Sequence, residues 1–273
     1  AKVLMALNTY ADAHDAGPWH RAVDKAVALG ADALIVADTA VMAYCRDHHP
    51  GLRLHLSVQA SATSHAAIEF YRRRYGIQRA VLPRVLTLQQ VGQLIRHTAV
   101  HIEVFGFGSL CVMVEGRCAL SSYVTGQSPN NAGVCSPPSA VRWVDGPEGV
   151  QARLNDVLID CYAPDEPRGY PTLCKGRFDV AGERDYAIEE PTSLNTLALL
   201  PELMALGVKA IKIEGRQRSA AYVGQVTAVW RAAIDHARAA PGRYAVLPEW
   251  TAQLARHAEG QQHTLGAYNR PWR

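Results

Sequence analysis

The sequence predicts an α/β fold: a (β/α) TIM-like barrel that is incomplete at its amino end, with about six of eight strand–helix units, and that carries a cysteine-bearing insert. Two observations predict this fold. Short aliphatic runs alternate with segments of helical period over the first 107 residues, and the alternation resumes after a long interruption. No Gly-x-Gly-x-x-Gly follows the first run, which disfavours the competing open dinucleotide-binding sheet.

Five strands are predicted in the first part of the barrel, residues 1–107. They are residues 3–7, 33–37, 53–58, 80–83 and 102–107. Apolar residues recur at intervals of three and four in each segment between them, so we predict a helix in every gap. Gly30 and Gly76 follow the first and third of these helices, where a left-handed residue is expected to end a helix.

The alternation stops for some eighty residues, in a stretch rich in Gly, Pro, Ser and Asn that contains four of the six cysteines. We predict that residues 108–192 form the cysteine-bearing insert and its loops. Residues 193–207 are then predicted as a helix, 208–213 as a strand and 219–240 as a helix with one apolar face. Residues 193–240 would therefore supply the last barrel strand and its helices, and residues 241–273 a C-terminal extension.

Composition places the chain among ordinary globular proteins, because 48% of its residues are hydrophobic and 19% are charged. The net charge of +3 is too small to predict nucleic-acid binding, and we interpret the basic run Arg72–Arg74 as a solvated helix face. No apolar run reaches the ~20 residues of a membrane span and no leader is recognisable, so we expect a cytoplasmic protein. Cysteines there are reduced thiols or metal ligands.

Polar residues follow the predicted strands at their carboxyl ends, which form the functional face of a parallel barrel. Gln59, Arg84 and Glu214 have no evident local duty and predict a polar cavity for an anionic or hydroxylated substrate. Asp38 and Ser61 precede helices, so we interpret them as caps rather than ligands.

Strand alternation adds Lys212 on the same side as Glu214, and Arg216 follows shortly after. Arginines in such a place bind carboxylates through paired hydrogen bonds. The candidate catalytic residues are thus Gln59, Arg84, Lys212, Glu214 and Arg216. The alternative for Lys212 with Glu214 is an internal salt-bridge layer.

The insert's cysteines, Cys111, Cys118, Cys135 and Cys174, are separated by six, sixteen and thirty-eight residues. None forms a Cys-x-x-Cys pair, so structural zinc is not the natural interpretation. Four thiolates from separate loops can hold an iron–sulfur cluster, but buried unlinked cysteines explain the spacing equally well. Cys45 and Cys161 lie in apolar segments, and we expect them in the core.

Four segments resemble the collagenase-like peptidase family of undetermined catalytic type, family U32. They are EVFGFGSLCVMVEGRCALS (103–121), YPTLCKGR (170–177), EEPTSLNT (189–196) and IKIEGRQRSAAYV (211–223). Within the family, the segments DALIVAD, SVQASAT, LNDVLID and TLGAYNRPWR are most similar to the ubiquinone-biosynthesis members of the UbiU type.

That resemblance implies a 4Fe-4S cluster held by Cys111, Cys118, Cys135 and Cys174. It also implies a heterodimer with a UbiV-like protein, acting with a lipid-binding accessory protein. The implied reaction is oxygen-independent, anaerobic hydroxylation of a ubiquinone precursor, with prephenate as the expected oxygen donor and no nucleic acid involved. Family members begin with about two further strand–helix units, so we expect this chain to be a fragment.

Two other functions are compatible with the family. A peptidase is one, although the sequence contains neither Gly-x-Ser-x-Gly nor His-Glu-x-x-His. Hydroxylation of tRNA or ribosomal RNA is the other, since relatives modify RNA with similar clusters. The small net charge disfavours RNA as the substrate.

Overall fold

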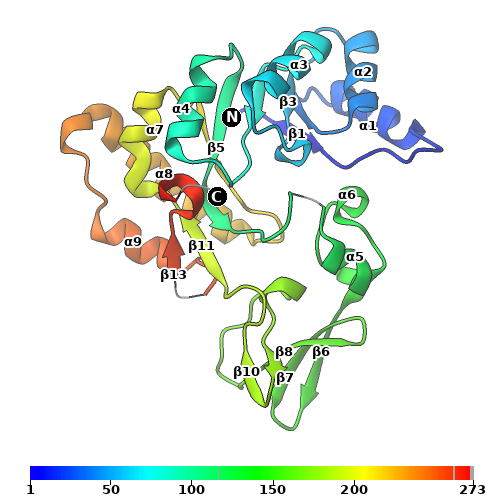
Figure 1. Cartoon of the computed structure of the whole chain (residues 1–273), viewed down its shortest axis with the longest axis vertical. Coiled ribbons are helices and arrows are strands. Elements are labelled where there is room, and N and C mark those ends of the chain that lie inside the picture. Colours follow the sequence, from blue (N-terminus) through cyan, green and yellow to red (C-terminus); the bar gives the residue numbers. More distant parts are fainter. Residues whose placement is uncertain (116, 261, 271–273) are drawn as a thin grey trace. The chain divides into compact units, whose positions relative to one another are not determined.

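A computed structural model describes residues 1–115, 117–260 and 262–270 of the chain. Gly116 and the closing residues 271–273, both within the segments that carry the family resemblance, lie outside the described residues. The chain forms two compact units (Figure 1). The first unit consists of Ala1–Asn8, Ala13–Leu110 and Thr192–Arg273, and the second of Thr9–Asp12 and Cys111–Pro191.

A parallel sheet forms the first unit's framework, and its first five strands pair in chain order. These strands are β1 (Leu4–Leu7), β2 (Ala33–Val36), β3 (Leu54–Leu56), β4 (Arg79–Val81) and β5 (His101–Ser109). The helices between them are α1 (Gly17–Ala28), α2 (Thr39–His48), α3 (His65–Tyr75) and α4 (Leu88–Arg96). All nine elements were predicted from the sequence periodicity, and each is confirmed to within a few residues.

Strand β5 is the longest strand and pairs with two others on one side. It pairs in parallel with β12 (Ala210–Ile213), while its carboxyl end pairs antiparallel with β11 (Thr192–Asn195). Strand β11 in turn pairs in parallel with β13 (Gln262–Thr264). The sequence predicted a helix from residue 193, and this is wrong for residues 193–195. Helix α7 (Leu200–Leu206) begins only where Pro201 occupies its first turn, a position that proline favours.

The predicted barrel does not close within the described residues, because β1 pairs only with β2. What the structure confirms is the α/β class and a mostly parallel eight-stranded sheet.

Helix α8 (Ala220–Ala239) supplies much of the first unit's core. Its buried residues Val226, Trp230 and Ala233 lie on one face, as the sequence periodicity predicted, and pack with Phe107 of β5. Val223, predicted on the same face, is 45% exposed. Helix α9 (Pro248–Ala255) packs against α8 through the buried Leu254. None of the helices in the described ranges is long and apolar enough to cross a membrane.

The second unit is built from short helices and two antiparallel sheets. Its helices are α5 (Ala119–Thr125) and α6 (Pro129–Ala132). Its larger sheet contains β6 (Val141–Gly146), β7 (Gly149–Leu154) and β8 (Val157–Tyr162), and the smaller one pairs β9 (Phe178–Val180) with β10 (Glu183–Asp185). The 3-10 turn η3 (Leu173–Lys175) lies between these sheets in the sequence.

Candidate functional site

The four cysteines predicted as cluster ligands all belong to the second unit, and none is in a disulfide. Cys111 is exposed and begins the longer segment of the unit, two residues after β5 ends. Cys118 is the N-cap residue of α5, Cys135 is an exposed loop residue after α6, and Cys174 is the central residue of η3. Three separate loop regions therefore carry the four thiols.

Ser121, in the first turn of α5, joins two of these regions. Its backbone N–H donates a hydrogen bond to Cys118 Sγ at 3.3 Å, and its hydroxyl donates to the carbonyl oxygen of Cys135. Ser121 is only 3% exposed, so water does not compete for these bonds. The start of α5 thereby holds the Cys135 loop close to Cys118.

The Cys174 segment reaches the same region, since η3 packs against α5. Burial raises the pKa of the Cys174 thiol, Thr172 and Lys175 oppose this shift, and Cys111 lies near enough to raise the pKa further. The Cys174 carbonyl accepts a hydrogen bond from the Glu189 N–H at 3.1 Å. A metal that binds this thiol must therefore displace a proton.

The donor chemistry of these residues fits a 4Fe-4S cluster, which is held by four thiolates. All four cysteines are outside disulfides, and the segments of Cys118, Cys135 and Cys174 are linked through Ser121 and the packing of η3 on α5. Cys111 and Cys135 are exposed. Within the described part of the chain, no three His, Cys, Asp or Glu side chains are already gathered closely enough to bind a metal ion.

The other two cysteines are core residues, as the sequence predicted. Cys45 is 1% exposed within α2, and burial raises the pKa of its thiol to about 11. Cys161, in β8, is 6% exposed. Both side chains are enclosed among apolar residues, so both serve packing.

The candidate residues at the carboxyl ends of strands belong to the first unit. Gln59 is 6% exposed in the 3-10 turn η1 (Val58–Ala60), and the Arg84 guanidinium lies 3.6 Å from the ring centroid of Phe105. Asp38 caps α2, because its carboxylate accepts from the N–H groups of Ala40 and Val41. This confirms the interpretation of Asp38 as a cap.

Ser61, in contrast, does not cap the helix that follows it. Ser64 is the N-cap of α3 and accepts from the Ala67 N–H at 3.2 Å, whereas Ser61 ends η1 in a left-handed conformation with φ of 52°. The sequence SATSH offers several hydroxyls in a row, and the one nearest the first helical turn takes the capping position.

Lys212 and Glu214 do not form the salt-bridge layer that was the alternative for this pair. A register irregularity after Lys212 interrupts the alternation that placed Lys212 and Glu214 on one side. The Glu214 carboxylate accepts from the Arg216 N–H at 2.9 Å, and no ion pair joins it to Lys212 among the described residues. Gly108, with φ of +129°, lets β5 approach Glu214 closely, since a Cβ there would lie 2.5 Å from Glu214 Cβ.

Two charged pairs in the first unit escaped the sequence analysis. Arg79 pairs with Glu103 at 3.3 Å beside the buried His55. Polar residues at alternate positions of otherwise apolar strands are the sequence signal that could have indicated this pair. Because Arg79 begins β4, this cluster lies at the amino end of the sheet, where barrel residues stabilise rather than catalyse. Arg218 pairs with Glu259 at 2.5 Å, and no local pattern indicates that pair.

Comparison with known proteins gives one family match. The sequence model described as peptidase family U32 matches residues 1–270. The chain is 31% identical over 239 residues to "tRNA hydroxylation protein P" of Escherichia coli, covering 80% of this chain and 52% of that protein. It is 30% identical over 235 residues to the "23S rRNA 5-hydroxycytidine C2501 synthase" of the same organism, covering 86% of this chain and 31% of that enzyme.

A relative with a different name is similar to the same degree. The chain is 28% identical over 247 residues to a "Collagenase" of Porphyromonas gingivalis, covering 86% of this chain and 51% of that protein. The chain thus spans about half the length of the first relatives that it matches.

Proposed function

Because this chain belongs to peptidase family U32, and because one of its units carries four thiols outside disulfides, we propose that it is the iron–sulfur component of an oxygen-independent hydroxylase. The observation that carries the proposal is the thiol set: Ser121 joins the Cys118 and Cys135 segments, and η3 with Cys174 packs on α5. Relatives named for hydroxylation of tRNA and of 23S rRNA support this class of reaction.

Each residue of the thiol set has a stated role in this proposal. Cys111, Cys118, Cys135 and Cys174 would hold the cluster as thiolates, and a bound 4Fe-4S cluster supplies one-electron transfer. The Ser121 N–H already donates to the Cys118 sulfur, a type of hydrogen bond that tunes the reduction potential of such clusters. Lys175 is adjacent to Cys174 and its charge favours the thiolate form.

Anaerobic reconstitution tests the cofactor. We expect iron, acid-labile sulfide and a paramagnetic signal from the unaltered protein, with loss of the signal when any one of the four cysteines is changed to alanine. Cys45→Ala is the matched control, because Cys45 is a core thiol in the first unit and should leave the signal intact. A colourless protein without iron or sulfide would reject the proposal.

We propose a ubiquinone precursor as the substrate, with a UbiV-like protein as the heterodimer partner and a lipid-binding accessory protein. The UbiU-type segments of the sequence support this choice. Arg84 and Arg216 would bind the carboxylates of an acidic oxygen donor such as prephenate. Stacking on Phe105 restricts the Arg84 guanidinium, which lowers the entropy lost when it binds a carboxylate.

RNA is the second candidate substrate, favoured by the printed names of two relatives. The two substrates separate in one experiment: mass spectrometry of quinone intermediates and of RNA nucleosides from an anaerobically grown deletion strain. Accumulation of an unhydroxylated quinone precursor supports the first substrate, and loss of a hydroxylated nucleoside with normal quinones supports RNA. Peptidase activity ranks lower, and peptide cleavage by a cluster-free preparation would reverse that ranking.

A further inference from the structure

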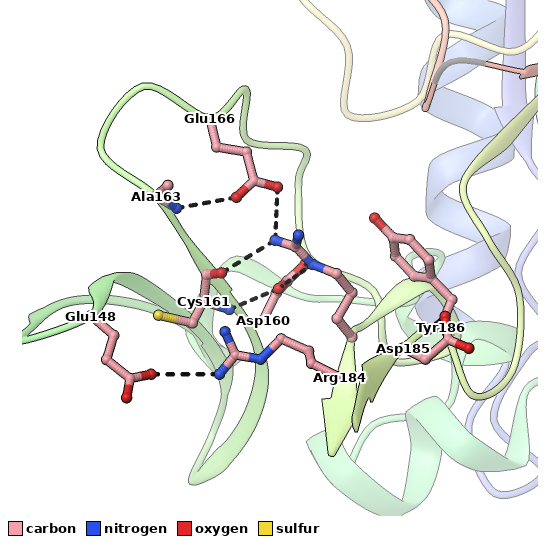
Figure 2. Close-up of polar contacts among 9 residues, drawn as sticks. Glu148, Asp160, Cys161, Ala163, Glu166, Arg184, Asp185 and Tyr186 are labelled. Atoms are coloured by element: carbon pink, nitrogen blue, oxygen red, sulfur yellow. Dashed lines mark hydrogen bonds and ion pairs between the residues drawn. The ribbon is translucent and has the colours of Figure 1, made fainter. Parts of the chain in front are cut away.

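A charged network in the second unit joins Arg177, three residues after Cys174 in the sequence, to the buried Asp160 of β8 and to Glu166 in the turn after β8. Arg177 donates from Nε to both carboxylate oxygens of Asp160, at 2.8 and 3.0 Å, and its terminal nitrogen contacts Glu166 Oε1 at 2.8 Å. The same nitrogen also donates to the Cys161 carbonyl at 3.2 Å. Figure 2 shows these contacts converging on one guanidinium group from Asp160, Cys161 and Glu166.

Both acidic partners are themselves held in place by the backbone. Asp160 is 2% exposed, and its Oδ1 accepts from the Cys161 N–H at 2.8 Å. Glu166 accepts from the Ala163 N–H at 3.1 Å through its other carboxylate oxygen (Figure 2). The Arg177 guanidinium therefore binds acceptors that are held in place by β8 and the turn after it. Arginine fixes the direction of its hydrogen bonds best in such an arrangement.

Gly176 provides a second anchor for the same segment. A Cβ at this position would lie 2.6 Å from the Ile159 carbonyl oxygen and 2.7 Å from the Phe178 ring, so the backbone of residue 176 lies directly on β8. Glycine meets that requirement because it has no side chain. Two neighbouring residues, two and three positions after Cys174, are thus docked on the strand.

We propose that Arg177 and Gly176 are positioning residues for the cysteine ligand Cys174, and that the Asp160–Arg177–Glu166 network fixes the η3 turn against β8. This inference rests on the proposed cluster function. Residues outside the ligand set that orient metal ligands typically change metal affinity by about 10- to 100-fold when they are altered. A network that only stabilised the unit would have no special effect on the cluster.

Iron release from the anaerobically purified full chain tests this role. Arg177→Gln should release iron to a chelator about tenfold faster than the unaltered protein. Arg184→Gln is the matched control, since Arg184 lies in the same unit but makes an exposed ion pair with Glu148 at 3.7 Å (Figure 2). Gly176→Ala should act like Arg177→Gln, whereas Gly169→Ala should not, because nothing lies within 4 Å of a Cβ at Gly169.

A second measurement uses the metal-free protein. Alkylation of Cys174, followed by peptide mass spectrometry, should accelerate in Arg177→Gln because the turn that buries the thiol is released. Alkylation of Cys118 is the internal reference. This measurement separates the two proposals. If the unaltered protein binds no cluster, but Cys174 is still alkylated faster in Arg177→Gln, only the proposed function is rejected.

Three results would overturn the positioning role. The first is equal iron release from Arg177→Gln and unaltered protein. The second is equal acceleration by Arg184→Gln and Arg177→Gln, which would indicate a general effect of removing charge from the unit. The third is loss of folding, seen by circular dichroism, in both Arg177→Gln and the conservative Arg177→Lys, since the network would then be a general stability element.

Discussion

At the scale of single residues, His55 shows how the first unit keeps a buried histidine neutral. It lies in β3 between Leu54 and Leu56 and is 7% exposed. Burial, together with the smaller effect of the positive charges of Arg79 and Arg53, lowers its pKa to about 4. At neutral pH the imidazole therefore stays uncharged beside the Arg79–Glu103 pair.

This histidine should make folding stability depend on pH in a defined window. The unfolded chain binds the proton near pH 6.5 and the folded chain only near pH 4, so stability is retained above pH 6.5 and falls as the pH is lowered towards about 4. The limiting slope is about 1.4 kcal/mol per pH unit. His55→Gln should flatten this decline in urea unfolding at pH 7, 6 and 5. An equal flattening by His65→Gln, which alters an exposed residue, would contradict the prediction.

The sequence predicted the role of a residue correctly where that role depends on its near neighbours in the chain. Asp38 is followed directly by the helix that it caps, and Cys45 shares the period of a single helix, so short windows were sufficient. Arg218 was missed because its partner Glu259 is forty-one residues away. The spacing of the four cysteines was equally compatible with buried core thiols and with cluster ligands. Contacts such as that of Ser121 with the Cys135 loop depend on the fold and are not visible in the spacing.

At the scale of elements, α2 offers a test of whether Asp38 is a cap or a ligand. Asparagine caps helices about as well as aspartate, while alanine costs about 1 kcal/mol. Asp38→Asn should therefore preserve the free energy of unfolding, and Asp38→Ala should lower it by about that amount. If Asp38 bound substrate through its charge, Asp38→Asn would lose substrate affinity without losing stability, and thermal unfolding paired with a binding assay distinguishes the outcomes.

Elements were predictable where a local pattern marks them, as in the strands whose chain neighbours pair, in β12 and in α8. The first five strands pair in sequence order, so their alternation with helices carried the prediction. Strand β11 was misread because Ser193, Leu194 and Asn195 precede a leucine-rich helix and share its composition. Its extended conformation comes from pairing with the end of β5, more than eighty residues earlier, which no local pattern reveals.

At the scale of the whole molecule, the two units divide the proposed work. The first unit carries Gln59, Arg84 and Glu214, and the second carries all four proposed ligands. Strand β5 ends at Ser109, two residues before Cys111, so the longest strand of the first unit leads directly into the second. A cluster bound in the second unit should consequently stabilise that unit by linkage, because it binds only the folded form.

Hydrogen exchange measured by mass spectrometry can locate this effect. Anaerobic chelation of the iron should raise amide exchange at least about tenfold in peptides from residues 111–191, because the second unit loses the free energy of cluster binding. Peptides from β2 to β5 should keep their protection, since their hydrogen bonds and core belong to the first unit. Cys174→Ala, reconstituted in the same way, is the control and should resemble the chelated protein from the outset. If chelation raised exchange equally in both units, or only in β2 to β5, then stabilisation by the cluster would not be confined to the unit that carries the cysteines.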